Sequence, residues 1–319
     1  MTKKRSSKFG GAATVSWGKR HVGVFRLLPA ALLFVCGGCG DFSPSTPDSV
    51  ADGEPRVISL APNLTEMIIA IGAGDQLVGR SSACDYPAAA LKNVPVVGGF
   101  GEPSMEVLLA QRPTLIVDVA LADQSLQHRL RQAGLHREHI PCTRLDEIPA
   151  ALRRLGRLLQ REEAARILAG ELEDELTRLR RQAARIPDAH RPLVFAEVWS
   201  EPLMTVGCSS FISECIRLAG GRNLGDENDT EYYYLSHERV VERNPDVILL
   251  LYMAEEKVAD RIATRIGWES LNAVRNRRIH DELDPDLIMR PGPRVLQGIA
   301  QMRRAIVNPD SPAAKERSP

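Results

Sequence analysis

The sequence has no apolar run of the roughly 18–20 residues that a membrane-spanning helix needs, which excludes a polytopic membrane protein. It also lacks the surplus of lysine and arginine that a general nucleic-acid-binding protein needs to neutralise phosphates. The 319 residues carry 41 basic and 41 acidic side chains, but residues 1–39 hold seven of the basic ones and no acid. The rest of the chain, with 34 basic against 41 acidic residues, therefore has a formal charge of −7.

Recognisable catalytic motifs are missing as well. The chain has no P-loop, no Gly-x-Ser-x-Gly elbow and no His-Glu-x-x-His zinc motif. Gly98-Gly99-Phe-Gly101 is rich in glycine but lacks the dinucleotide-binding spacing. The histidines of the body are scattered and form no sequence-local metal cluster. We therefore assign no catalytic residue, no metal ligand and no cofactor, and the alternative of an exported α/β enzyme has no constellation to support it.

The first 39 residues are typical of an export signal. A basic segment to Arg26 precedes the apolar stretch Leu27–Val35, and small residues then lead to Cys39. This order resembles a bacterial lipoprotein signal, in which the cysteine is lipidated and becomes the mature N-terminus. Two alternatives stay open: ordinary secretion after signal cleavage, and a thioredoxin-type redox motif in Cys36-Gly-Gly-Cys39.

The remaining chain divides by composition into a tether, two lobes and a helical connection. Residues 40–55 are rich in Pro, Ser and Asp and predict a flexible tether. The expected segments that follow are an N-terminal lobe over 56–150, helices over 151–187, a C-terminal lobe over 188–307 and a disordered tail over 308–319. Four cysteines lie in the body, Cys84, Cys142, Cys208 and Cys215, and an exported location permits either two disulfides or free thiols.

Strands alternate with helices along both lobes, which predicts α/β architecture with mainly parallel sheets. Asn63 and Glu66 have the spacing of a capping box for the first helix. Helix-forming residues predict one helix ending near Leu159 and a long one over Glu162–Ile186. The predicted strands are Arg56–Leu60, Leu77–Ser81, Thr114–Asp118, His139–Thr143, Leu193–Glu197, Asp246–Leu251 and Arg278–His280.

One segment occurs twice. The first copy is Glu106-Val-Leu-Leu-Ala-Gln-Arg-Pro113, followed by an apolar run. It aligns with Glu238-Arg-Val-Val-Glu-Arg-Asn-Pro245, which lies 132 residues later and is also followed by an apolar run. In each copy a glutamate begins a helix, a proline ends it and a strand follows. The repeat indicates two related lobes, although helix–Pro–strand junctions are common enough to match by accident.

Aromatic residues are scarce: only ten follow residue 55. Most of them are expected in loops or at strand ends, where they suit the lining of a large, flat, apolar ligand, because Tyr and Trp present a rigid face and a polar tip. Plugging the ends of the sheets is the alternative for any one of them, and Trp268 in the turn after Gly267 is expected to be structural. The candidates are Tyr86, Phe100, Trp199, Tyr232, Tyr233, Tyr234 and Tyr252.

Several segments together resemble the substrate-binding proteins of ABC importers in the cobalamin and ferric-siderophore group. They are Arg56–Glu66, Cys84-Asp-Tyr-Pro87, Val97-Gly-Gly-Phe100, Glu201–Gly207, Leu218–Leu224 and Arg290-Pro-Gly-Pro-Arg294, in family order. Cys84–Pro87 and Val97–Phe100 are most similar to the cobalamin branch. The resemblance implies two α/β lobes joined by one long rigid helix, with a ligand cleft between the lobes and no enzymatic activity.

The resemblance also implies site residues. Aromatics at the positions of Tyr86, Phe100 and Tyr232 face the corrin ring, and Met204 stands where an aromatic can occur. Asp286 and Arg290 stand where polar groups near the ligand occur, although Arg290 has the alternative of bracing the Pro291–Pro293 turn. With Trp199 and Tyr234 from the aromatic pattern, these residues form the expected ligand site.

The repeated acids receive a role from the same resemblance. Glu106 and Glu238 match the two lobe-surface glutamates that meet arginines on the two permease subunits, and the alternative is that each only favours its helix N-terminus. The expected protein is a lipid-anchored binding protein, outside the cytoplasm, that delivers cobalamin or a related corrinoid to an ABC permease and its ATPase subunits. A ferric siderophore or haem is the alternative ligand, and Tyr234, His237 or Met204 are the residues considered as axial ligands of haem.

Overall fold

Two sheets, one in each half of the chain, carry the architecture of the computed structural model, which describes residues 53–119, 124–252 and 259–307. The first sheet has the order β4-β3-β2-β1-β5-β6, and only β4 runs antiparallel to its neighbour. Its strands are β1 (Val57–Ser59), β2 (Leu77–Ser81), β3 (Val96–Gly99), β4 (Glu102–Pro103), β5 (Leu115–Asp118) and β6 (Arg137–His139). Its helices are α1 (Pro62–Ala70), α2 (Ala88–Leu91), α3 (Met105–Ala110) and α4 (Gln124–Gln132).

The second sheet is mixed. Its order is β10-β8-β7-β11-β12, with β9 also paired to β7, and β8 runs antiparallel to both β7 and β10. The tyrosine run expected in a loop or at a strand end forms a strand of its own, β10. The strands are β7 (Leu193–Trp199), β8 (Met204–Val206), β9 (Arg222–Asn223), β10 (Tyr232–Tyr234), β11 (Val247–Leu250) and β12 (Ile279–His280). The helices are α7 (Phe211–Leu218), α8 (His237–Arg243), α9 (Ala259–Ala263), α10 (Asn272–Arg275), α11 (Pro285–Met289) and α12 (Val295–Ile306).

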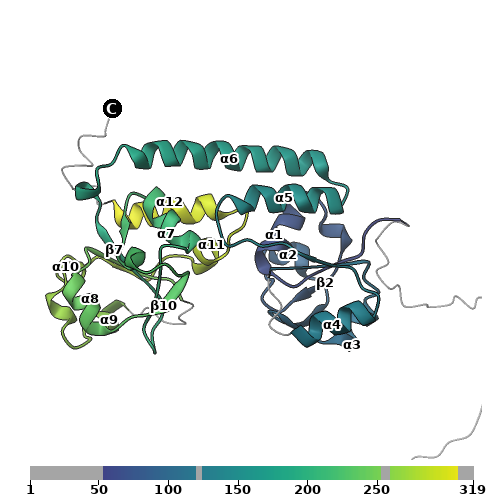
Figure 1. Ribbon diagram of the computed structural model, residues 1–319, viewed down its shortest axis with the longest axis horizontal. Helices are drawn as coiled ribbons and strands as arrows, with labels where there is room; N and C mark the ends of the chain where they lie inside the picture. The colour runs from purple at the N-terminus through teal and green to yellow at the C-terminus, as the bar shows by residue number, and fades with distance from the viewer. Residues whose placement is uncertain (1–52, 120–123, 253–258, 308–319) are drawn as a thin grey trace, which may run out of the picture. The chain divides into compact units, whose positions relative to one another are not determined.

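Two consecutive helices, α5 (Glu147–Leu158) and α6 (Glu162–Ala184), carry the chain from the first lobe to the second (Figure 1). The 23 residues of α6 extend about 34 Å at 1.5 Å per residue. A Cβ atom at Gly156 would lie 2.4 Å from the Cβ of Ala165, so the glycine lets α5 and α6 pack closely. The expected long connecting helix is therefore present. Of the described helices, none combines the length and apolar character needed to cross a bilayer.

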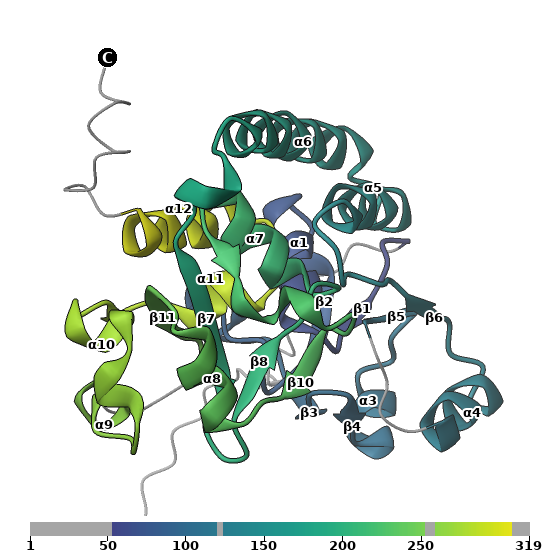
Figure 2. The ribbon, with the colours of Figure 1, turned by 60° about the vertical axis from the view of Figure 1, so that its left-hand side comes forward.

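The buried face of α6 joins the cores of both lobes. Alanine and leucine recur on it at intervals of three and four residues, the spacing of a single helix face: Ala165, Ala169, Leu172, Leu176, Leu179 and Ala183. This face packs on α5 and, further along, on α7, as the view turned by 60° also shows (Figure 2). A hydrophobic cluster containing Val57 in β1 and Val194 in β7 continues through these helices. The outer face of each sheet has its own smaller cluster.

The sequence repeat is also a structural repeat. α3 and β5 recur as α8 and β11 with the offset of 132 residues, and both strands occupy an inner position in their sheets. Ser104 caps α3 and Ser236 caps α8 by accepting a backbone N–H three residues later. Arg112 and Asn244, each just before the proline, share a φ of 46°. The predicted helix–Pro–strand repeat is confirmed.

Two local predictions were wrong. Helix α1 begins at Pro62, one residue before the expected cap, and neither Asn63 nor Glu66 forms a capping box. The rigid φ of Pro62 suits the first helical position, and both polar side chains bind a segment more than 220 residues later instead. The strand expected over 139–143 is β6, Arg137–His139, because its register with β5 ends at His139 and Pro141 has no N–H for the ladder.

Candidate ligand-binding cleft

A cavity of about 980 Å³ lies where strands of both sheets end. Pro62 and Ala83 follow β1 and β2, and Phe100 follows β3. From the second sheet, Trp199 ends β7 and Tyr252 follows β11. Ligands of open α/β sheets bind outside the carboxyl ends of the strands, so this cavity is in the expected position for a binding site.

A second cavity of about 410 Å³ adjoins the first. Pro62, Phe100, Met289 and Arg290 line both, so the two form one cleft with contributions from both lobes. The smaller part also has Tyr232 and other residues along its wall. We call the two cavities together the cleft. The expected position of the ligand site between the lobes therefore coincides with a real cavity.

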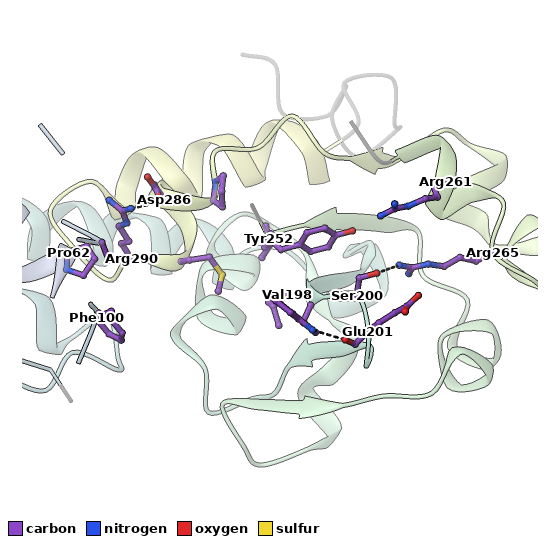
Figure 3. Close-up of a pocket in the computed structure, with 15 residues that line it drawn as sticks. Pro62, Phe100, Val198, Ser200, Glu201, Tyr252, Arg261, Arg265, Asp286 and Arg290 are labelled. Carbon is purple, nitrogen blue, oxygen red and sulfur yellow. Dashed lines mark hydrogen bonds and ion pairs between the residues drawn. The ribbon is translucent and has the colours of Figure 1, made fainter. Parts of the chain in front are cut away.

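Five of the eight expected ligand residues line the cleft. Phe100 and Trp199 are 53% and 57% exposed, and both border the larger cavity. Asp286 and Arg290 lie on its wall, near Phe100 in Figure 3. Tyr232 lines the smaller cavity. The exposed Phe100 comes from one lobe and the exposed Trp199 from the other, so the cleft has an aromatic side chain on each side.

The other three expected residues, Tyr86, Met204 and Tyr234, line neither cavity. The Tyr86 ring lies 3.7 Å from the guanidinium carbon of Arg294, which occupies a stacking position on it. Met204 packs against the main hydrophobic core. Tyr234 is 65% exposed and pairs with Met204 in the register of β10 and β8.

Arg290 and Arg294 connect the second lobe to the first through carboxylates. Arg294 binds Glu66 with two hydrogen bonds of 2.7 Å, and the Glu66 side chain is buried. Arg290 contacts Asp85 at 2.7 Å, Asp286 at 2.8 Å and Glu66 at 3.4 Å. The hydrogen bonds from Arg290 lower the pKa of Asp85, whereas burial raises the pKa of Asp286. The guanidinium of Arg290 therefore contacts carboxylates from both lobes.

The residues between these arginines hold the same junction. The Pro291 carbonyl accepts hydrogen bonds from Asn63 Nδ2 at 3.2 Å and from the Cys142 thiol at 3.1 Å. We call residues 290–294 the clamp segment. It belongs to the second lobe by sequence, between α11 and α12, but its partners lie in the first. Among the described residues, the junction between the lobes therefore includes this segment as well as α5 and α6.

Several cleft residues escaped the sequence analysis. Arg261 and Arg265, together with Ser200 and Glu201, line the end of the larger cavity that lies away from Phe100 in Figure 3. Arg265 binds the fully buried Glu197 at 2.6 and 2.8 Å. The four-residue spacing of the two arginines was the available signal, but it is common on exposed helices. Tyr252 was among the aromatic candidates for a ligand lining, although not among the eight expected ligand residues, and it lines the larger cavity.

The remaining expectations concern thiols and surface acids. Cys84, Cys142, Cys208 and Cys215 are all free, and burial raises the pKa of Cys142 to about 12.

Trp268 is fully buried and lies edge-on to Phe195, which confirms its structural role. Glu106 and Glu238 are exposed in the first turns of α3 and α8.

Comparison with known proteins gives the family. The model of the family described as periplasmic binding protein matches residues 57–286, and the chain belongs to this family. It is 26% identical to the protein named uncharacterized ABC transporter substrate-binding lipoprotein YvrC of Bacillus subtilis strain 168, over 90% of this chain and 98% of that protein.

Solved structures agree with the fold and narrow the class. The periplasmic vitamin B12-binding protein BtuF of Vibrio cholerae has a TM-score of 0.67 and 29% identity, covering 79% of this chain and 96% of that one. The haem-binding protein RhuT of Roseiflexus sp. RS-1 has a TM-score of 0.70 and 28% identity, covering 79% and 98%. The chain is therefore a substrate-binding protein of the ABC-transporter type, in the group that includes vitamin B12- and haem-binding proteins. Proteins of this class act outside the cytoplasm with permease and ATPase components.

The signal segment 1–39 with Cys39, residues 40–52 of the tether, and the tail 308–319 lie outside the described residues. The boundaries predicted for them stay predictions.

Proposed function

We propose that this protein captures a corrinoid, cobalamin or a close relative, in the cleft and delivers it to an ABC permease. The observation that carries the proposal is the pairing of Phe100 and Trp199 across a cavity of about 980 Å³. Ligand pockets are concave and are lined mainly by apolar and aromatic side chains, which is the setting of both rings. Their rings suit the apolar face and edge of a corrin, and the similarity to BtuF supports this ligand class.

Titration of the purified protein with cobalamin tests the proposal. We expect one-to-one binding that quenches tryptophan fluorescence, because Trp199 borders the cavity. Phe100→Ala and Trp199→Ala should each weaken binding by about two- to twelvefold beyond the effect of lost area, since a ring contact contributes about 0.5–1.5 kcal/mol. The same substitution at Tyr234 is the control and should change the affinity little, because that exposed ring lines neither cavity. If all three variants bind cobalamin as tightly as wild type, Phe100 and Trp199 do not belong to the binding site.

Haem is the second candidate ligand, and one feature of the cleft favours it. Met289 lines both cavities, and a methionine thioether is a known axial ligand of haem iron. The residues considered from the sequence are less well placed: Met204 and Tyr234 line neither cavity, and His237 contacts the Trp268 ring. Tight binding of haem, lost in Met289→Leu, together with no binding of cobalamin at high micromolar concentration, would replace the corrinoid proposal.

We also propose that Cys39 carries a lipid anchor. The order of basic, apolar and small residues before Cys39 supports this, as does the naming of YvrC as a lipoprotein. Cys39→Ser should release the protein from the membrane fraction without changing ligand affinity, since the apolar run is too short to span a bilayer. Fractionation of cells followed by immunoblotting measures the release. Continued sedimentation of the variant with membranes would refute the anchor.

The proposed contacts with the permease are Glu106 and Glu238. Both are exposed, both follow a capping serine by two residues, and both begin the repeated helix. In Figure 1, α3 and α8 lie on the side of their lobes away from α6. One acid on each lobe suits a partner with two equivalent subunits, where charge pairs mainly set the encounter and the register.

A further inference from the structure

One end of the larger cavity is rich in hydrogen-bond donors. Figure 3 shows Arg261 and Arg265 directed toward the region of Tyr252 and Ser200, at the end away from Phe100 and Arg290. All four residues line the cavity. We call this end the arginine end of the cleft.

Arg265 is fixed in this position by several contacts. Its guanidinium binds both oxygens of the buried Glu197, donates to Ser200 Oγ at 3.0 Å and lies 4.6 Å from the centre of the Trp268 ring. Glu197 offsets the charge of Arg265, so Arg265 mainly contributes a rigid donor surface. A planar guanidinium held in this way is a pre-organised donor for an oxyanion.

Arg261 and Tyr252 differ from Arg265 because their polar atoms are free within the part of the chain that the structure describes. The Arg261 guanidinium forms no hydrogen bond or ion pair with another described residue. The buried Tyr252 hydroxyl lies near the Glu197 carboxylate, but no described polar atom meets it with the distance and angle of a hydrogen bond. Burial and then the nearby Glu197 carboxylate raise the pKa of Tyr252 to about 12, so the hydroxyl keeps its proton at neutral pH. A buried hydroxyl without a partner is costly unless a ligand supplies one.

Resting on the proposed function, we infer that the arginine end binds an oxyanion group of the ligand, a phosphodiester or a carboxylate, with Arg261 as the charge that selects it. Two other carboxylates border the cavity. Asp286 is paired with Arg290 at 2.8 Å, and Glu201 forms no ion pair with a described residue. The Glu201 carboxylate therefore repels an anionic ligand group, and neutralising it is expected to strengthen the binding of that group.

The ligand classes differ in where their anionic group comes from. Cobalamin has a phosphodiester in its nucleotide loop, which cobinamide lacks although it keeps the corrin ring. Haem has two propionates, which its dimethyl ester lacks although it keeps the porphyrin. The haem pair differs only in its free carboxylates, whereas the corrinoid pair also differs in the ribose and base of the nucleotide loop. A preference for cobalamin over cobinamide is therefore assigned to the phosphodiester only if Arg261→Gln removes it.

The experiment measures dissociation constants of the full chain for all four ligands, in wild type and in Arg261→Gln. A charge-assisted hydrogen bond corresponds to a change of about tenfold in affinity. Arg261→Gln should therefore weaken the binding of cobalamin by about that factor and the binding of cobinamide by less than about twofold. Glu201→Gln should strengthen cobalamin binding. Arg275→Gln, the control, removes the same charge from an exposed position on α10 and should change the affinity for neither cobalamin nor cobinamide. Arg265→Gln is avoided because it would leave the buried Glu197 unpaired.

The outcomes separate this inference from the corrinoid proposal. Loss of the preference for cobalamin over cobinamide in Arg261→Gln alone supports both. If only the haem pair binds and its preference for free propionates disappears in Arg261→Gln, the oxyanion site stands and the corrinoid proposal falls. If cobalamin and cobinamide bind equally in wild type, or if Arg261→Gln weakens both by the same factor, the oxyanion site is wrong and the corrinoid proposal survives.

Discussion

Replacing Arg294 with glutamine should destabilise the protein by about 2–4 kcal/mol, because the substitution leaves the carboxylate of Glu66 buried with a weaker partner. Glu66 is 4% exposed and accepts both hydrogen bonds from Arg294, whereas Arg290 approaches it only to 3.4 Å. The variant also loses the guanidinium that lies over the Tyr86 ring. The free energy of unfolding, obtained from urea denaturation followed by circular dichroism, measures the effect.

Two matched variants show whether burial is the cause. The double variant Glu66→Gln/Arg294→Gln should recover part of the loss, since no uncompensated charge remains. Arg166→Gln removes an arginine with the same two-bond geometry to Glu163 on the exposed face of α6, and its denaturation midpoint should match wild type. If Arg166→Gln and Arg294→Gln have equal effects, the clamp segment contributes no more than a surface ion pair.

Reversing the charge at both Glu106 and Glu238 should abolish uptake while leaving ligand affinity nearly unchanged. Both glutamates are exposed, and neither borders the two cavities of the cleft. If each meets a basic group on the permease, Glu106→Arg and Glu238→Arg replace attraction with repulsion, which costs several kcal/mol across an interface. The double variant should be more severe than either single one, because the acids lie on different lobes. Uptake of labelled ligand by cells and affinity of the purified protein are measured on the same variants.

The control is charge reversal at exposed acids elsewhere. Glu171 on α6 and Glu269 beside Trp268 are exposed, and their double reversal to arginine makes the same change in net charge. Uptake by this control should stay close to wild type. Uptake that survives the reversal of Glu106 and Glu238, or a matching fall in ligand affinity, would show that the repeat is only architectural.

Local sequence signals located the elements because their causes are local. Apolar runs bounded by proline or glycine marked β2 and β5 to within one residue, and the helix-forming stretch marked α6 at its first residue, Glu162. The tyrosine run was misjudged because its strand pairs with β8 across 26 or more residues. The capping-box interpretation failed for a similar reason, since Glu66 satisfies a cap pattern locally but is used by a distant arginine.

The expected ligand site also divides into residues that a local sequence signal marked and residues whose role depends on distant contacts. Phe100, Trp199, Tyr232, Asp286 and Arg290 line the cleft, and the first three stood out because aromatics are scarce. Tyr86 resembles a ligand-facing residue in sequence and is 45% exposed, but it lines neither cavity, and Arg294, 208 positions away, stacks over its ring. No sequence signal marked Arg261, and only the fold brings it into the same cavity as Tyr252, an aromatic candidate from the sequence.

The sequence alone determined the two-lobe α/β architecture, the long connecting helix, the repeat at 132 residues and the class of protein. These follow from hydrophobic periodicity, proline breaks and family segments, which are readable along the chain. Only the tertiary structure decided which charges meet: Glu66 with Arg294, Asp85 with Arg290, and Glu197 with Arg265, at separations of 68 to 228 residues. A buried carboxylate needs a partner at hydrogen-bond distance, and chain topology, not sequence spacing, brings that partner to it.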